Sequence, residues 1–487
     1  MLSRIELRRG VYHDSVVLMR VTSQLSQMDG LDGCLVAMAT PLNIGLLGDL
    51  GFDVEQIDSA STSDLVVAIR AESDDIMEEA FKQLDSELAS SRDTATGAGD
   101  TPVHHLLGNA VRDSNANLAI ISLPGPHVVP ETVDALLEGA NVMVFSDGVT
   151  MDEERRLKAL AAERDLLVLG PDCGTARLCG IALGFCNDLG QGGVGIIAAS
   201  GTGAQHLTCL LDARNVGIGD IIGVGGRDMT DEIGGASTLR ALEMLDADQN
   251  TTHIVVISKQ PGPEATRKLE QVVANLKTPV TFALLGNKET DLTKVAREVT
   301  AACNMTFSEP RIEISGRAAS GGQLVGLFSG GTLAGEATTI INASIDSVAN
   351  LETFETPTPM TIASFDQHLL VDLGDDRMTV GRAHPMIDAT VRREIIQILA
   401  ERPAPRVLFI DIVLGFGADP DPVGAIRSSL EKFIASHEET RVVVSFVGTS
   451  RDPQGYEAQW RKLAEIGCDV YESNANAATA VAALIKQ

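Results

Sequence analysis

Short apolar runs alternate with amphipathic stretches along most of this chain. The apolar runs at residues 34–40 and 65–70 predict buried strands, and residues 74–88 carry apolar positions at helical spacing. The same alternation resumes at residue 118 and continues toward the C-terminus. Strands that alternate with helices of ten or more residues predict βαβ units and parallel sheets. We therefore expect an α/β protein that binds ligands at the carboxyl ends of its strands.

Two long segments share one pattern. Residues 238–287 and 391–450 each read as helix, strand, Pro/Gly loop, helix, strand and glycine loop, with nearly the same lengths. We interpret this as an internal duplication of a three-layer domain. The alternative is that any two α/β segments look alike at this level.

Composition narrows the class of protein. The 487 residues include 44% hydrophobic but only 3% aromatic residues, which predicts cores of Val, Ile, Leu and Ala. The net charge of −29 argues against binding to nucleic acid or to an anionic membrane. No apolar run is long enough to span a membrane and no signal peptide follows Met1, so a cytoplasmic protein is expected. The seven cysteines form no CxxC pair, which predicts reduced structural thiols. The spacing of His104, His105 and His127 does not favour a metal, so no metal is expected.

The first candidate site follows the apolar run 194–199. Small residues at the start of a helix leave backbone N–H groups open to an anion, and a hydroxyl can add a donor. No lysine of a nucleotide-binding P-loop follows, and Ser200 does not lie in a G-x-S-x-G turn. The alternative is an ordinary helix cap. The predicted phosphate contacts here are Ser200, Gly201, Thr202 and Gly203.

A second glycine loop ends the strand predicted at 409–414. It contains Gly415, Phe416 and Gly417, and the Asp-Pro residues behind it can start a helix. Two helix N-termini from duplicated domains could face one phosphate from opposite sides. We therefore add this loop to the predicted phosphate site.

Several motifs resemble the succinyl-CoA synthetases. Residues 118–174, 194–205 and 223–228 look like the α-subunit, and residues 329–341 and 370–487 look like the carboxyl-terminal domain of the β-subunit. This layout, without an ATP-grasp domain, resembles the FdrA family of acyl-CoA-synthetase-like proteins, as do the motifs at 10–20, 381–388, 448–454 and 472–478. The resemblance implies a Rossmann-like domain at 1–190 and flavodoxin-like domains with parallel sheets at 191–310 and 311–487.

The synthetases carry phosphate on a loop histidine that this chain lacks. No histidine lies between His253 and His368, where that loop would fall. The resemblance therefore implies acyl-phosphate chemistry on a small carboxylic acid without a phosphohistidine. Its sharpest form is carbamoyl transfer between oxamate and carbamoyl phosphate in ureide breakdown. Phosphate or an acyl phosphate is the expected ligand.

The resemblance also implies substrate contacts and a candidate acid. Arg227 and Arg451 could hold the substrate's charge, or they could be surface arginines. His384 could be a general acid, or it could be a packing or capping histidine beside Pro385. Ser200 is the second predicted catalytic residue. The implied substrate-binding residues are Gly225, Gly226, Arg227, Gly448, Thr449, Ser450 and Arg451.

CoA binding stays open at this point. The loop at 36–45 lacks the close glycines of the synthetase CoA loop. The implied CoA contacts are Thr40 in this loop and Pro171 and Cys173 further along the chain. Cys173 could also be a buried thiol beside a turn. No G-x-G-x-x-G follows the first strand, so no NAD is expected.

Two further function classes remain as alternatives. One is an acyl-CoA synthetase or CoA transferase subunit with a separate nucleotide-binding partner, and the other is a non-catalytic scaffold. A homodimer is the default for this kind of fold. An additional partner subunit is also expected, since the chain lacks part of the synthetase machinery.

Overall fold

The computed structural model divides the chain into two compact units. Residues 1–103 with 379–388 form the N-terminal unit, and residues 104–378 with 389–487 form the large unit. The structure describes residues 2–486 except 12, 14, 27, 29, 58, 59, 63, 94–103, 260, 287, 288, 318–321, 346, 381, 403–405, 437 and 438.

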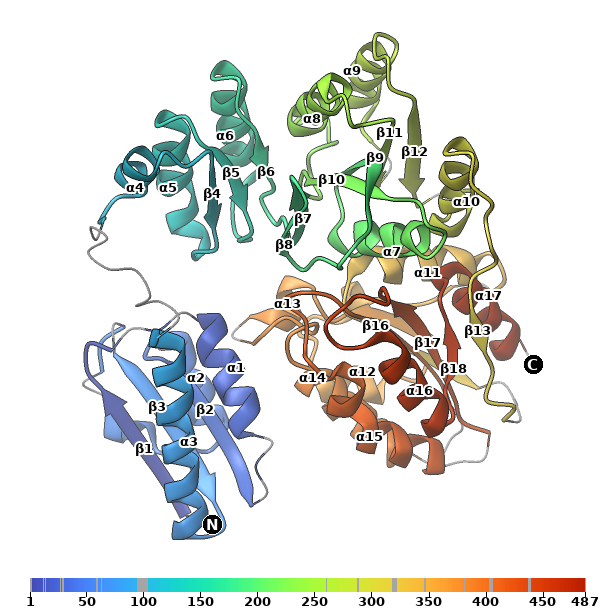
Figure 1. The fold of residues 1–487 in the computed structure, drawn as a ribbon. Coiled ribbons are helices and arrows are strands. Elements are labelled where there is room, and N and C mark those ends of the chain that lie inside the picture. Colours follow the sequence, from blue (N-terminus) through green and yellow to red (C-terminus); the bar gives the residue numbers. More distant parts are fainter. Residues whose placement is uncertain are drawn as a thin grey trace. The chain divides into compact units, whose positions relative to one another are not determined.

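The N-terminal unit is built on an antiparallel sheet, in the order β1-β3-β2 (Figure 1). Alternate residues of the central strand face opposite sides: Leu65 and Val67 pack under α1 and α3, whereas Val66 and Ala68 pack under α2 and η1. The expectation of one Rossmann-like domain over residues 1–190 with a parallel sheet is therefore wrong for these strands. The elements are β1 Leu2–Arg8, α1 Ser15–Leu25, β2 Leu31–Met38, α2 Pro41–Asp49, η1 Val54–Ile57, β3 Leu65–Ala71 and α3 Asp74–Asp93.

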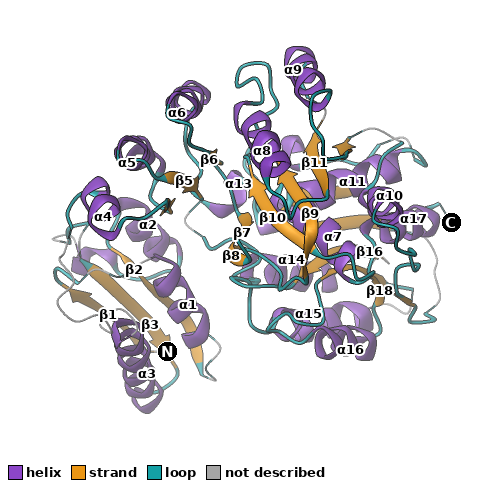
Figure 2. Cartoon of the chain, turned by 45° about the horizontal axis from the view of Figure 1, so that its top comes forward, coloured by secondary structure: helices purple, strands orange, loops and turns teal. Residues whose placement is uncertain are grey.

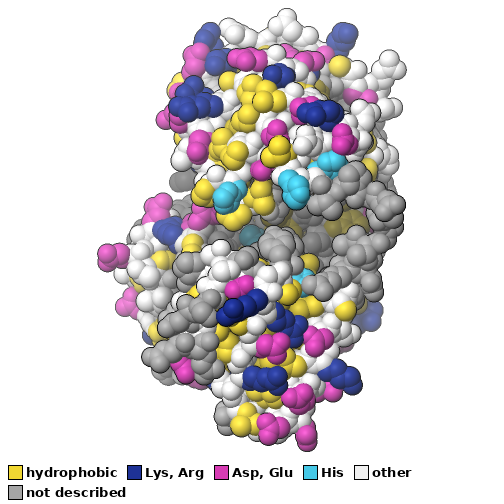
Figure 3. Space-filling model, turned by 90° about the vertical axis from the view of Figure 1, so that its left-hand side faces the viewer, with side chains coloured by type: hydrophobic (Ala, Val, Ile, Leu, Met, Phe, Trp, Pro, Cys, Tyr) yellow, Lys and Arg dark blue, Asp and Glu magenta, His cyan; other side chains and the backbone are white. Residues whose placement is uncertain are grey.

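The large unit begins with a small parallel sheet, in the order β4-β5-β6. Its edge strand β4 exposes Ile120, and Leu106, Leu123 and Leu137 are exposed on the neighbouring elements. Figure 3 shows hydrophobic side chains gathered on this side of the molecule. The expected homodimer stays a prediction. The elements are α4 Leu107–Ser114, β4 Leu118–Ile121, α5 Gly125–Leu137, β5 Asn141–Val144, α6 Met151–Glu163 and β6 Val168–Leu169.

The second sheet of the large unit, here the middle sheet, has the order β12-β11-β9-β10-β7-β8. Strands β9 to β12 are parallel, and the hairpin β7–β8 joins them antiparallel at β10. The elements are β7 Thr175–Leu178, β8 Ile181–Gly184, β9 Gln191–Ala198, α7 Gly201–Asp212, β10 Ile218–Gly223, α8 Ala236–Ala247, β11 His253–Lys259, α9 Pro263–Val273, β12 Val280–Leu285 and α10 Leu292–Ala302.

The third sheet, here the C-terminal sheet, has the order β13-β18-β17-β16-β14-β15. Its parallel strands follow the 2-1-3-4-5 order of flavodoxin-like folds, which confirms the predicted fold class. The elements are β13 Ile312–Glu313, β14 Gln323–Phe328, α11 Gly331–Asn342, η2 Leu351–Thr353, α12 Pro359–Ser364, β15 Leu369–Asp372, α13 Asp376–Thr379, α14 Thr390–Ala400, β16 Arg406–Val413, α15 Pro422–Ser436, β17 Arg441–Val447, α16 Tyr456–Ile466, β18 Asp469–Tyr471 and α17 Asn474–Ile485.

Strand order and register relate the two larger sheets. When the parallel strands of each sheet are numbered in chain order, β9–β12 lie across the middle sheet in the order 4-3-1-2. The strands β14–β18 lie across the C-terminal sheet in the order 5-4-3-1-2, which is the same topology with one more strand. Val194 in β9 pairs with His253, and Leu324 in β14 pairs with Val407. The first helix begins seven residues after each of these positions, and both helices, α7 and α11, have 12 residues. Each position of α7 thus matches the position of α11 that is 130 residues later, as the predicted duplication requires.

Four helices lie where the two larger sheets face each other (Figure 2). Helix α7 packs with α10, α11 packs with α17, and the two pairs meet through α7 with α11 and α10 with α17. The helices α14, α15 and α16 cover the opposite face of the C-terminal sheet, over a core that includes Trp460 and Phe433. This arrangement brings the N-termini of α7 and α11 together. Within the described ranges, no helix is both long and apolar enough to cross a membrane.

Candidate functional site

The predicted loop at Ser200 forms a capped helix N-terminus. Ser200 has an extended backbone, and its hydroxyl accepts a hydrogen bond of 3.0 Å from the N–H of Gly203. The same hydroxyl lies 2.5 Å from the hydroxyl of Thr332. Ser200 is therefore an N-cap, and it also joins α7 to α11.

The helix opposite α7 is α11, its counterpart in the duplication. A Cβ on Gly330 would overlap the side chain of Thr202, and one on Gly203 would lie 3.0 Å from Cγ2 of Thr332. Gly330 has no side chain to cap α11, so the N–H groups of that first turn are not bonded by an N-cap side chain. Two positive helix ends thus meet at one place, which favours an anion there. We call Ser200–Gly203 with Gly330–Thr332 the paired helix mouths.

The second phosphate loop predicted from the sequence is not one of these mouths. Gly415 is hydrogen bonded to Gln454, the N–H of Phe416 donates to the carbonyl of Cys186, and α15 begins only at Pro422. These contacts place Gly415–Gly417 against the segment before β9. One helix N-terminus of the pair comes from each copy, but the partner of Ser200–Gly203 is Gly330–Thr332; phosphate contacts at Gly415, Phe416 and Gly417 stay a prediction.

Two other predicted loops lie beside α7. Gly225 has a positive φ of 84°, and a Cβ there would lie 2.5 Å from the carbonyl oxygen of Pro171. The carbonyl of Ala199, next to Ser200, lies 3.7 Å from the position of a Cβ on Gly226. Gly225, Gly226 and Pro171 therefore border the mouth of α7.

Arg227 and Cys173 are held by protein groups. The guanidinium of Arg227 donates to Glu154 at 2.9 Å and to the carbonyl of Val149 at 2.8 Å. Burial raises the pKa of the Cys173 thiol to about 12, which fits a structural thiol and not a nucleophile.

The predicted substrate loop Gly448–Arg451 lies at the wrong end of α7. The hydroxyl of Thr449 donates to the carbonyl of Asp188, and Arg451 pairs with Asp212, the last residue of α7. Eleven residue steps place Asp212 about 16 Å along the helix from Gly201. Gly448, Thr449, Ser450 and Arg451 therefore do not converge with the paired helix mouths.

Thr40 and His384 group with the N-terminal unit. Thr40 caps α2 by accepting from the N–H of Asn43 at 3.3 Å. His384 lies in the segment 379–388, and its Nδ1 accepts from the N–H of Met386 at 3.2 Å. The expected CoA contacts Thr40, Pro171 and Cys173 are thus divided between two units. This hydrogen bond is the kind of contact that a capping histidine makes.

Sequence reasoning missed a carboxyl group at the mouth of α11, Asp372, and a second one in its electrostatic range, Asp172. Oδ2 of Asp372, at the end of β15, lies 2.8 Å from the position of a Cβ on Gly331. Burial and the nearby carboxylates of Asp411, Asp375 and Asp172 raise the pKa of Asp372 to about 7, against a hydrogen bond from the N–H of Gly374. Desolvation and neighbouring carboxylates likewise raise the pKa of Asp172 to about 6. A carboxyl with a pKa near neutrality can give or take a proton beside a bound anion.

This geometry predicts pH-dependent anion binding. Sulfate, which stays a dianion between pH 6 and 8, should bind about tenfold more weakly at pH 8, because ionised Asp372 repels it. In Asp372→Asn most of this pH dependence should disappear, with the remainder due to Asp172. Isothermal titration calorimetry with sulfate at pH 6, 7 and 8 measures the affinity of both proteins. An unchanged pH dependence in the variant would rule out Asp372 as the cause.

No group of three or more His, Cys, Asp and Glu side chains among the described residues is arranged to hold a metal ion. Cys34, the one cysteine in residues 1–103 of the sequence, is buried, and burial raises its pKa to about 12.

Two family models match parts of this chain, and several known proteins are similar to it. Residues 1–103 match the family model "AllF, heavy metal-associated domain", and residues 327–484 match the CoA-ligase model. The succinate–CoA ligase [ADP-forming] subunit alpha 2 of Archaeoglobus fulgidus is 26% identical over 33% of this chain and 56% of its own. The dinucleotide-forming acetyl-coenzyme A synthetase 1 of Ca. Korarchaeum cryptofilum is 16% identical over 76% of this chain and 82% of its own, with a TM-score of 0.30.

One relative matches from end to end. The protein YahF of Escherichia coli strain K12 is 33% identical to this chain, over 97% of this chain and 96% of YahF. The chain therefore belongs to the FdrA-like family of acyl-CoA-synthetase-like proteins that includes YahF.

Proposed function

We propose that this chain transfers an acyl group between inorganic phosphate and a small carboxylic acid, through an acyl phosphate and without a phosphohistidine. The observation that carries the proposal is the pair of helix mouths joined by the Ser200 and Thr332 hydroxyls. Aligned N–H groups at such a place stabilise charge that develops on phosphate oxygens, by about 3 kcal/mol for each well-placed donor. Free phosphate then acts as the nucleophile that accepts the acyl group, so the transfer needs no phosphohistidine.

The sharpest form of the proposal is carbamoyl transfer between oxamate and carbamoyl phosphate. A phosphate oxygen attacks the ureido carbon of oxalurate, the C–N bond to oxamate breaks, and carbamoyl phosphate forms. The leaving nitrogen needs one proton, and hydrogen phosphate loses one. The pKa of about 7 of Asp372 and its position beside Gly331 support a role for this carboxyl group in passing that proton. In ureide breakdown this reaction would use oxalurate as the substrate.

The proposed reaction converts oxalurate and phosphate into oxamate and carbamoyl phosphate, so the formation of carbamoyl phosphate tests it. The purified chain, alone and with the partner subunits that the sequence leads us to expect, is incubated with oxalurate and phosphate, and carbamoyl phosphate is followed by ³¹P NMR. Ser200→Ala should lower the rate about a hundredfold. The matched control is Thr338→Ala, whose hydroxyl donates within α11 to the carbonyl of Ala334. Absence of carbamoyl phosphate in every combination would remove this form of the proposal.

A second candidate is acyl-CoA ligation or CoA transfer with a separate nucleotide-binding subunit. The CoA-ligase match at residues 327–484 favours it. Calorimetry with CoA discriminates between the two readings: micromolar binding supports the second, and no heat of binding supports the first.

A further inference from the structure

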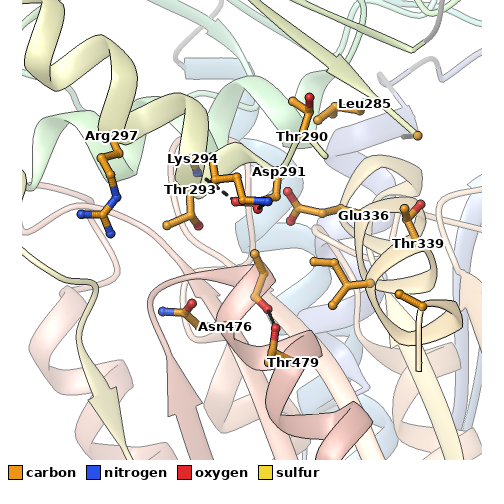
Figure 4. Close-up of a pocket in the computed structure, with 14 residues that line it drawn as sticks. Leu285, Thr290, Asp291, Thr293, Lys294, Arg297, Glu336, Thr339, Asn476 and Thr479 are labelled. Carbon is orange, nitrogen blue, oxygen red and sulfur yellow. Dashed lines mark hydrogen bonds and ion pairs between the residues drawn. The ribbon is translucent and has the colours of Figure 1, made fainter. Parts of the chain in front are cut away.

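A cavity lies apart from the paired helix mouths. It has a volume of about 380 Å³, between the start of α10, the second half of α11 and the start of α17 (Figure 4). Its walls include Thr290 and Lys294 from the α10 side, Glu336 and Ile340 from α11, and Asn476 from α17. None of residues 200–203 or 330–332 lines it.

The duplication relates this cavity to the region between α7 and the start of α17. The first N–H of α10, on Leu292, donates to Oε1 of Glu336 at 2.7 Å. The first N–H of α17, on Asn474, donates to Nε2 of His206 at 3.2 Å. Glu336 and His206 occupy matching positions of α11 and α7. The contact of α10 with α11 is therefore repeated by the contact of α17 with α7.

On the α7 side the matching space is filled by an arginine. The guanidinium of Arg214 donates to the carbonyl of Leu210 at 3.0 Å and to Glu472 at 2.5 Å. It also lies 4.7 Å from the centre of the Phe307 ring. The group that fills this space is thus planar, carries N–H donors and meets a helix carbonyl.

On the α11 side the matching residue is Ser344. Its N–H bonds back to Ile341 at 2.8 Å, as the N–H of Arg214 bonds back to Leu211 at 2.9 Å, so the two backbones correspond at this residue. The Ile340 carbonyl also accepts from the N–H of Ala343 at 3.3 Å, which leaves it one further lone pair. Ile340 matches Leu210, and Thr290 precedes the cap of α10 as Glu472 precedes the cap of α17. Serine is too short to fill the corresponding space from position 344, and the cavity is lined there by Ile340, Ala343 and Thr290.

The walls of the cavity define the chemistry of an occupant. Glu336 is 5% exposed and already accepts N–H donors from Leu292 and from the Asn474 side chain. Lys294, which pairs with Asp291 at 3.1 Å, brings an ammonium group to the opposite wall, and Arg297 lines the same helix face (Figure 4). The α10 wall thus carries both cations together with the Asp291 carboxylate, and Arg297 is paired with Glu309 at 2.9 Å, so Lys294 is the cation nearest to Glu336 in Figure 4.

We propose that this cavity binds a small carboxylic acid that carries a planar amide or ureido group. The planar group replaces the missing guanidinium, with its N–H groups toward the Ile340 carbonyl and Glu336, and the carboxylate meets Lys294. The inference does not depend on the proposed reaction, because binding is measured without turnover. Burial raises the pKa of Glu336 to about 7, so N–H donation to its ionised form would add affinity as the pH rises above 7.

The test uses N-carbamoylglycine as the probe, with acetate and N-methylurea as its two halves. Saturation-transfer NMR and calorimetry with the full chain should show N-carbamoylglycine binding at least tenfold more tightly than either half. Ser344→Arg, which supplies the missing guanidinium, should weaken it at least tenfold, and Lys294→Met should do likewise. The matched control is Lys462→Met, which removes a lysine in a similar ion pair with Asp421 on another helix.

Variants also separate this cavity from the helix mouths. Gly330→Ala, which disturbs the mouths, should leave binding of N-carbamoylglycine unchanged. Thermal melts and circular dichroism establish that Ser344→Arg and Lys294→Met are folded. Loss of binding in Gly330→Ala, full binding in both Ser344→Arg and Lys294→Met, or no preference for the intact probe over its halves would each overturn the proposal.

Discussion

Replacing Gly330 by alanine is expected to lower phosphate affinity and turnover about a hundredfold while the protein remains folded. The new methyl group would overlap the side chain of Thr202, so the mouths of α7 and α11 must move apart. A displacement of about 1 Å between groups that hold a reacting molecule can cost this factor. Gly330 has φ −153°, an ordinary extended conformation, so overlap and not backbone strain causes the effect. Phosphate calorimetry and the carbamoyl phosphate assay measure it.

The control for this variant lies one turn further along the same helix. Gly335 has no atom within 4 Å of the position of an added Cβ, so Gly335→Ala should bind phosphate normally. It should also stabilise α11 by about 0.5–1 kcal/mol, because alanine loses less backbone entropy than glycine in a helix. Equal phosphate affinity in Gly330→Ala and Gly335→Ala would contradict a phosphate site at the paired helix mouths.

The half of the site at α7 could be predicted because its signals are local. A buried strand followed by small residues and a cap-forming serine at position 200 marks a helix N-terminus in any context. Its partner could not be chosen in this way, since Gly330 and Gly415 both end buried strands and both precede helices. The predicted duplication identifies the partner when it is extended toward the N-terminus. Ser200 then matches Gly330, whereas Gly415 follows the end of β16 and has no part in this match.

The relative direction of the strands in the first hundred residues could not be predicted from the pattern of apolar and polar positions. The apolar positions of β2 and β3 show that the strands are buried, but they say nothing about whether the strands run parallel. The edge strand β1 shows little burial, with Leu2 exposed, and was not recognised at all. Alternation of strands and helices therefore predicted a Rossmann-like domain where the chain forms an antiparallel sheet.

The proton-carrying groups also depend on tertiary contacts. Asp372 follows a buried strand in the sequence, as many aspartates do, and its raised pKa comes from burial and from carboxylates on other strands and loops. Asp411 is 39 residues away and Asp172 is 200 residues away along the chain. Only the assembled sheets bring these side chains within reach of the mouth of α11.

Replacing Arg392 by methionine is expected to give the largest loss of stability in the C-terminal sheet. Arg392 donates to Oδ1 of Asp411 at 2.6 Å, to the Asp411 carbonyl at 2.9 Å and to the Ser329 hydroxyl at 2.7 Å. Both charged side chains are buried, at 4% and 0% exposure. Methionine leaves the Asp411 carboxylate buried without its cation, which costs about 3–5 kcal/mol. The thermal midpoint should fall by roughly 5 °C or more.

The same variant reaches the paired helix mouths through one residue. Asp411 accepts hydrogen bonds from the N–H of Ser329, which directly precedes Gly330, so a displaced Asp411 should also weaken phosphate binding. The matched control is Arg427→Met, an exposed helical arginine paired with Glu431, which should cost at most about 0.5 kcal/mol. Equal destabilisation by the two variants would show that the buried pair contributes no more than a surface pair. Arg392→Met with lower stability but normal phosphate affinity would separate the ion pair from the geometry of the site.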